Sequence, residues 1–110
     1  MKLPVYVEFR GMEHSDAIAT VAQAYAHKLE SAVPNTIACH IGIDLERPPK
    51  QQEHLYGVRI DLTIPGHELM VSRVQREDVE VAMRDAFSTM HSQLEALARE
   101  SRASRPMPLQ

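Results

Sequence analysis

The sequence is poor in the residues that stabilise small secreted or metal-dependent domains. Its 110 residues contain one cysteine, Cys39, together with three tyrosines, two phenylalanines and no tryptophan. A single cysteine excludes an intrachain disulfide framework and a cysteine-based zinc site, and it favours a reducing, cytoplasmic setting. No apolar run approaches the roughly 20 residues that a membrane-spanning helix needs. We therefore expect neither a disulfide-stabilised fold nor a membrane partner.

Motifs of catalysis and metal binding are also missing. The four glycines are scattered, so there is no phosphate-cradling glycine loop, and there is no nucleophile elbow. The histidines have neither the i, i+2 spacing of a metal pair on a strand nor the i, i+4 spacing of one on a helix. They are His14, His27, His40, His54, His67 and His91. We therefore expect no metal, no cofactor and no enzymatic activity.

Length and composition predict one globular domain and a short tail. Hydrophobic residues make up 44% of the chain and charged residues 25%, which is typical of globular proteins. A chain of this size buries about two-thirds of its unfolded surface, which is enough for one core. We expect the domain over residues 1–100 and a disordered tail over residues 101–110, where serine, arginine and proline accumulate.

Two kinds of apolar periodicity predict the secondary structure. Alternation with period two predicts strands over residues 4–9, 37–45, 56–64 and 68–74, and the helical stripe predicts helices over residues 16–33 and 77–100. Every strand has one apolar face. The sequence therefore predicts an α+β domain of order β-α-β-β-β-α, in which one four-stranded sheet carries both helices on the same face.

The dipeptide Pro65-Gly66 fixes the pairing of the last two strands. It is typical of a type II turn, so these strands are expected to run antiparallel. The expected pairs are Ile64 with His67, Leu62 with Leu69, and Ile60 with Val71. In this register the apolar faces agree. The predicted core contains Tyr25, Ile41, Ile60, Leu62, Met83 and Phe87, with Ile37, Cys39, Met12, Met70 and Met90 in or near it.

The other face of the predicted sheet is polar. It is expected to carry Glu8, Arg10, His40, Asp44, Arg59, Asp61 and Thr63. His40 and Asp44 project from one strand and could form an acid–base pair. The alternative is that these residues are solvated cross-strand polar pairs.

Basic residues flank the apolar stripes of the two helices. Two adjacent helices on one sheet could bring Lys28 of the first and Arg84 of the second to a shared positive seam. The alternative is that these bases form ordinary i, i+4 ion pairs, Arg84 with Glu80 and Arg99 with Glu95.

Four segments carry a resemblance that covers about residues 4–100. They are residues 5–11, 15–18, 28–30 and 77–87, and the last is the most specific. The chain resembles the short ribosome hibernation-promoting factors, the ribosome-associated translation inhibitors also called sigma-factor modulation proteins. The resemblance implies a fold similar to double-stranded-RNA-binding domains and a protein without catalytic activity. The chain lacks the C-terminal domain that the long form of the family has, so we expect this protein to act as the short form does.

The resemblance also implies a function and a set of site residues. Proteins of this family bind rRNA of the small ribosomal subunit near the decoding region and hold ribosomes inactive under stress. Lys28 and Arg84 match basic positions of the family's helices, Arg99 and Arg102 match the basic end of its second helix, and His91 lies on the same flank as Arg84. We therefore expect a cytoplasmic protein that binds small-subunit rRNA and represses translation.

A different class of function stays open at this point. Residues 77–100 contain six acidic and two basic residues, a net charge of −4, whereas a helix that faces phosphates is normally basic. The alternative is a protein-interaction module on the same fold that has no RNA-binding activity. The apolar segment 69–71 could then support a homodimer by strand addition.

Overall fold

The computed structural model describes residues 4–32, 35–46 and 54–103. The elements are β1 (Val5–Arg10), α1 (Asp16–Ala32), β2 (Ala38–Glu46), β3 (Leu55–Ile64), β4 (His67–Arg76) and α2 (Val79–Ala103). The predicted order β-α-β-β-β-α is confirmed. The polar segment 47–53 and the predicted tail from residue 104 onward lie outside the described residues.

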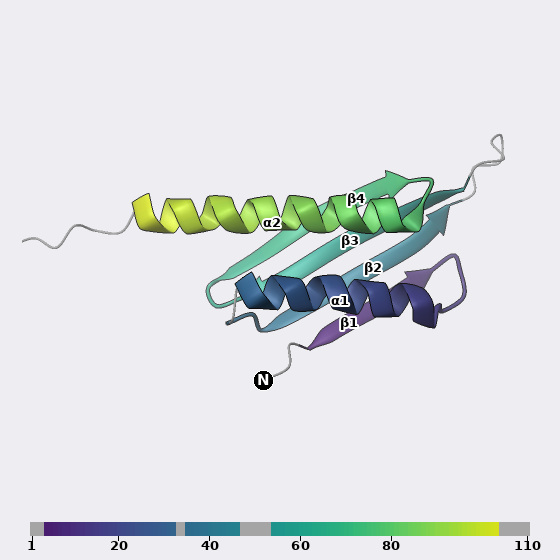
Figure 1. Cartoon of the computed structure of the whole chain (residues 1–110), viewed down its shortest axis with the longest axis horizontal. Coiled ribbons are helices and arrows are strands. Elements are labelled where there is room, and N and C mark those ends of the chain that lie inside the picture. The colour runs from purple at the N-terminus through teal and green to yellow at the C-terminus, as the bar shows by residue number, and fades with distance from the viewer. Residues whose placement is uncertain (1–3, 33–34, 47–53, 104–110) are drawn as a thin grey trace, which may run out of the picture.

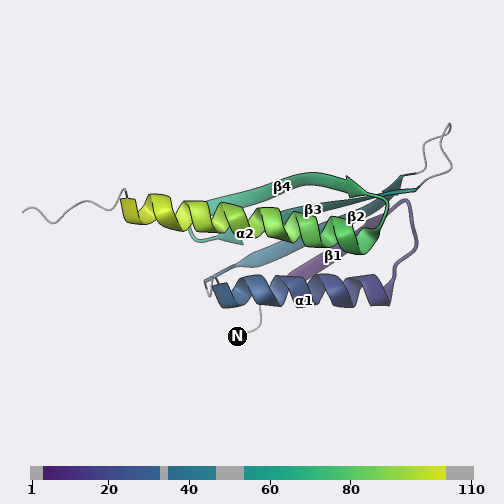
Figure 2. The same cartoon turned by 45° about the horizontal axis from the view of Figure 1, so that its top comes forward.

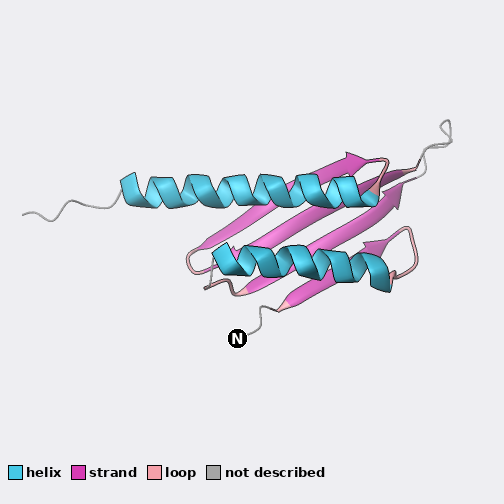
Figure 3. Cartoon of the chain, viewed as in Figure 1, coloured by secondary structure: helices cyan, strands magenta, loops and turns pink. Residues whose placement is uncertain are grey.

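The four strands form one mixed sheet in the order β1-β2-β3-β4. β1 pairs parallel with β2, and the other neighbours pair antiparallel. Both helices cover the same face of this sheet, side by side and running in the same direction (Figures 1, 2 and 3). No helix of the described residues lies on the opposite face, as the sequence predicted.

Polar side chains begin both helices. The Ser15 hydroxyl accepts a hydrogen bond from the Ile18 amide at 3.3 Å, and an Asp78 carboxylate oxygen accepts one from the Glu80 amide at 2.8 Å. These bonds satisfy amides that have no partner within the helix. The second helix was expected to end at about residue 100 but extends to Ala103, and its last turns lie beyond the β3–β4 turn (Figure 1).

The β3–β4 hairpin has the predicted register. Gly66 has a φ of 79°, which a type II turn requires, and all three expected residue pairs form. Farther along, Val58 pairs with Val74, so β4 contributes one more residue than β3 between this pair and Ile60–Val71. This β-bulge, at Ser72 and Arg73, was not predicted.

The core lies between the sheet and the helices. Its largest fully buried side chains are Ile41, Ile43, Ile60, Leu62, Met83, Met90, Val58 and Cys39. Phe87 is also buried, and Tyr25 packs at the margin. The prediction that Ile37 and Met70 lie in or near the core was wrong, because Ile37 is 54% exposed and Met70 is 48% exposed. Ile37 precedes the first residue of β2, and Met70 alternates with buried Val71 and so points to the open face.

Candidate nucleic-acid interface

An aromatic stack joins the two helices where the predicted interface lies. The rings of Tyr25 on α1 and Phe87 on α2 lie 5.2 Å apart between centroids, with 13° between their planes. The Lys28 ammonium lies 5.5 Å from the Tyr25 ring centroid. A cation at this distance is attracted by the ring and is held at the junction of the helices. Tyr25 was not predicted to support a site residue, although its i, i+3 spacing from Lys28 was a usable signal.

Arg84 lies on α2, one turn before Phe87. Its Nε donates to a carboxylate oxygen of Asp85 at 3.4 Å, and its side chain is 64% exposed. The alternative pairing with Glu80 is not the one that forms. Asp85 also accepts a hydrogen bond from Arg76 Nε of β4 at 3.1 Å, so Asp85 lies toward β4. Among the residues that the structure describes, only Nε of Arg84 is engaged, so its terminal nitrogens keep donors for another acceptor.

Lys28 and Arg84 lie on opposite sides of the aromatic stack along the helices. Lys28 follows Tyr25 by three residues, and Arg84 precedes Phe87 by three. Since the helices run in the same direction (Figure 1), the two positions are staggered by about 9 Å along the helix axes. Lys28 and Arg84 are therefore two separate cationic positions along the helices.

The other predicted site residues lie farther along α2. His91 Nε2 is 3.3 Å from a carboxylate oxygen of Glu95, so Glu95 pairs with His91 and not with Arg99 as the ion-pair alternative expected. Arg99 is exposed and, within the described part of the chain, forms no ion pair. The backbone of Arg102 belongs to the last turn of α2. The sequence thus correctly placed His91, Glu95, Arg99 and Arg102 on one helix. The expected ion pair of Glu95 with Arg99 was wrong, because Glu95 pairs with His91.

The acidic residues at the start of α2 have different positions relative to the junction of the helices. Asp78 caps the helix N-terminus through its side chain, and Asp85 is bound by Arg76 of β4. Between the N-terminal ends of the two helices lies a shallow groove whose lining is apolar except for Glu80. Glu80 therefore places a negative charge between the helices, one turn before Arg84, whereas Asp85 is bound on the side of β4.

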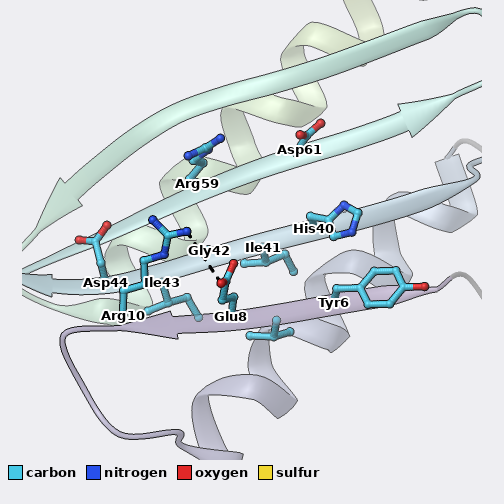
Figure 4. Close-up of a pocket in the computed structure, with 11 residues that line it drawn as sticks. Tyr6, Glu8, Arg10, His40, Ile41, Gly42, Ile43, Asp44, Arg59 and Asp61 are labelled. Atoms are coloured by element: carbon cyan, nitrogen blue, oxygen red, sulfur yellow. Dashed lines mark ion pairs between the residues drawn. The ribbon is translucent and has the colours of Figure 1, made fainter.

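The open face of the sheet has a different chemistry (Figure 4). The predicted pair of His40 and Asp44 is not assembled for acid–base work, because the carboxylate of Asp44 accepts two hydrogen bonds from Arg73, at 2.6 and 3.1 Å. The hydrogen bond to Asp44 is the main cause that raises the pKa of the Arg73 guanidinium. His40 instead stacks on Tyr6, with 4.7 Å between ring centroids.

Cys39 is a core residue, as predicted. Burial, and to a lesser extent the negative charge of Asp61, raises the pKa of the Cys39 thiol from 9.0 to about 12. The thiol is therefore neutral near pH 7 and is a poor nucleophile. Among residues 4–32, 35–46 and 54–103, no three His, Cys, Asp or Glu side chains gather as metal ligands. No helix in those ranges combines the length and the hydropathy of a membrane span.

β4 forms one edge of the sheet, at the segment where strand addition was considered. The Gln93 side-chain amide of α2 donates to the Met70 carbonyl oxygen at 3.3 Å. This carbonyl of the edge strand thus already has a partner within the chain.

Two solved structures share this fold. A ribosomal subunit interface protein from Coxiella burnetii matches with a TM-score of 0.76 at 12% identity, over 88% of this chain and 99% of that one. The N-terminal domain of Protein Y from Thermus thermophilus matches with a TM-score of 0.61 at 18% identity, over the same 88% and 99%. At these identities the likeness shows the fold.

A comparison with curated proteins found no significant match. A family match covers residues 5–102, almost the whole of the described chain, and the family is described as sigma 54 modulation protein / S30EA ribosomal protein. The chain belongs to this family, whose members are ribosome-associated factors and not enzymes.

Proposed function

We propose that this protein binds rRNA of the small ribosomal subunit through the seam between α1 and α2 and thereby represses translation under stress. The observation that carries the proposal is the position of Lys28, fixed over the Tyr25–Phe87 stack that joins the helices. Family membership supports a ribosomal partner.

The stagger of the two cations suits a nucleic-acid backbone. Lys28 presents a compact ammonium, whereas Arg84 presents a planar guanidinium that can hold two phosphate oxygens at once. Because the two positions are offset by about 9 Å along the helices, they fit two phosphates of one strand better than a single anion. Arg99 and Arg102 are two further basic positions toward the C-terminal end of α2.

The small number of cations limits the strength of binding. Each phosphate neutralised on a duplex lowers the logarithm of affinity by about 0.9 per logarithm of salt concentration. With two contacts, the affinity should fall by about tenfold between roughly 50 and 200 mM salt. Contacts by Arg99 and Arg102 would make this dependence steeper.

A double variant, Lys28→Gln with Arg84→Gln, tests the proposal. A matched control, Gln23→Glu with Ser92→Glu, changes the net charge by the same amount at exposed positions of the same two helices. Binding of the full chain to purified small subunits is measured by co-sedimentation at two salt concentrations, and repression is measured in cell-free translation. We expect the seam variant to bind about tenfold more weakly at low salt and to lose repression, while the control keeps both.

Equal binding by wild type, seam variant and control would overturn the proposal. The protein-interaction alternative predicts this result, with little dependence on salt. Sedimentation of the free protein then measures whether it forms a homodimer. Thermal melts of all variants show whether a loss of binding reflects unfolding, which is not expected because all four positions are exposed.

A further inference from the structure

The open face of the sheet contains a hollow on the side away from the helices. It has a volume of about 350 Å³ and lies over the middle of β2 (Figure 4). Its floor is the backbone at Gly42, and its walls come from β1 on one side and β3 on the other. The volume is at the lower end of the range for small-molecule sites.

Three of the four glycines are explained by the fold. Gly11 and Gly66 have φ values of 70° and 79°, which side chains rarely allow. At Gly57, a Cβ atom would lie 2.5 Å from Arg73 Nε and 2.6 Å from a carboxylate oxygen of Asp44. Gly57 therefore leaves the space through which these two side chains meet.

Neither backbone conformation nor lack of space explains the glycine at position 42. Its φ is not positive, and a Cβ atom there would meet only the Arg59 Cβ, at an ordinary contact distance of 4.0 Å. Glycine inside a strand weakens the strand, and it commonly marks a place where a ligand approaches the backbone closely. The fold would accept a side chain at Gly42, and that side chain would fill the hollow.

One wall of the hollow is an exposed aromatic pair. Tyr6 and His40 are direct neighbours across β1 and β2, and their rings stack with 20° between the planes. Tyr6 is 55% exposed although it is large and apolar over most of its surface. Aromatic rings presented on an open sheet are a common platform on which bases of single-stranded nucleic acids stack.

The charges around the hollow leave two groups unmatched. Asp44 is held by Arg73, and Glu8 lies 3.8 Å from Arg10. Arg59 is exposed and has no ion pair in the described ranges. On the same strand, Asp61 has a buried carboxylate oxygen, Oδ1, that has no hydrogen-bond partner among the described residues. The hollow thus offers a cation for an anionic group and a carboxylate for an N–H donor.

We propose that this hollow binds a nucleotide whose base carries an amino group. The base stacks on the Tyr6–His40 pair, the phosphate lies on Arg59, and the amino group is directed to Asp61. A flat ring, a donor and an anion within one small ligand match the three features that surround Gly42. The nucleotide can be free or part of a single-stranded RNA. Because the helices lie on the other face of the sheet, this site is independent of the seam at Lys28 and Arg84.

NMR titration of the full chain with GMP, UMP and inorganic phosphate tests the proposal. We expect GMP to shift the amide signals around the hollow saturably, with a dissociation constant near 1 mM or below, and UMP to bind more weakly because uracil has no amino group. Those signals belong to Tyr6, His40, Gly42, Arg59 and Asp61. A guanine-containing single-stranded hexanucleotide distinguishes the sources, since tighter binding than GMP indicates RNA and equal binding indicates the free nucleotide.

Two variants remove the site in different ways. Gly42→Val fills the hollow, and Tyr6→Ser removes an exposed ring whose loss should leave the core intact. Each should weaken GMP binding by about tenfold, in line with the contribution of one stacked base. Thr63→Val, on the same face but outside the hollow, is the matched control and should bind GMP as wild type does. If Gly42→Val fails to fold, Tyr6→Ser still decides the outcome.

Three results would overturn the proposal. They are the absence of saturable shifts with GMP, equal shifts with inorganic phosphate alone, and shifts confined to the helices. The Lys28→Gln and Arg84→Gln double variant should keep the GMP shifts. Its retention of nucleotide binding and loss of ribosome binding would separate the two sites.

Discussion

Arg73 of β4 reaches over β3 to bind Asp44 of β2, with 2.6 Å between Nη2 and a carboxylate oxygen. The same guanidinium lies 3.2 Å from a carboxylate oxygen of Glu46. Gly57 has no side chain, so the Arg73 side chain can cross β3 at this position. Arg73 itself lies in the β-bulge of β4. An edge strand is thus tied to a strand that is not its neighbour.

Substitution at Gly57 should destabilise the protein through this ion pair. In Gly57→Ala the new Cβ would lie within 2.6 Å of both charged side chains, and one of them must move. We expect a loss of about 1–3 kcal/mol in the free energy of unfolding, measured by urea denaturation. Combining Gly57→Ala with Arg73→Ala removes the clash with Arg73 and releases Asp44 from its hydrogen bonds to Arg73, so that Asp44 can move away from the new Cβ. The double variant should therefore lose less than the sum of the single variants.

Gly42→Ala is the matched control for that cycle. It places the same methyl group on the neighbouring strand, where a Cβ meets nothing closer than 4.0 Å. Its stability should equal or exceed that of wild type, because alanine loses less conformational freedom on folding. A loss as large as that of Gly57→Ala would contradict the account of both glycines.

Phe87 should be one of the most costly side chains to remove. It is buried, and its ring stacks on Tyr25. Phe87→Ala should lower the free energy of unfolding by about 3–5 kcal/mol in a denaturant melt. Ser88→Ala, at the next and exposed residue of α2, should change it little. A loss of less than about 1 kcal/mol at Phe87 would mean that the helices are not held by this contact.

Cys39 should make the stability depend on alkaline pH. Its folded pKa is raised from 9.0 to about 12, so the folded state holds the proton more tightly than the unfolded state does. The resulting stabilisation is complete below pH 9.0 and is lost as the pH rises toward 12. Between about pH 8 and about pH 10, wild type should lose about 1 kcal/mol more stability than Cys39→Ala. Parallel curves for the two proteins would show that the thiol ionises equally in both states.

Local patterns in the sequence predicted the elements and one register. The alternation of Leu62 and Ile60 with polar residues, and the turn at Pro65-Gly66, are local features that fix which residues face each other. Strand order is a different matter, because alternation does not tell which strand lies beside which. The parallel pairing of β1 with β2 and the bulge at Ser72 and Arg73 depend on contacts between distant segments.

The sequence placed the candidate bases on the two helices but did not predict which side chains they contact. Helical spacing predicted Arg84 on a flank of the apolar stripe of α2, and its side chain is 64% exposed. Its ion pair with Asp85 escaped prediction, because Asp85 is positioned by Arg76 from β4 and not by the i, i+4 rule. Met70 was misplaced because its apolar character outweighed the alternation that puts Val71 in the core.

The end of α2 projects past the sheet (Figure 1). Among the side chains of α2 that the structure describes, Leu97 is the last to pack against the core. Residues 98–100 are exposed, so their contribution to the free energy of folding depends strongly on helix propensity, which differs little among Ala, Arg, Glu and Lys. Charge on this projecting end can therefore drift over evolutionary time at almost no cost in stability. Related chains could therefore differ in their affinity for a polyanion at this end of the helix while they keep the same folded domain.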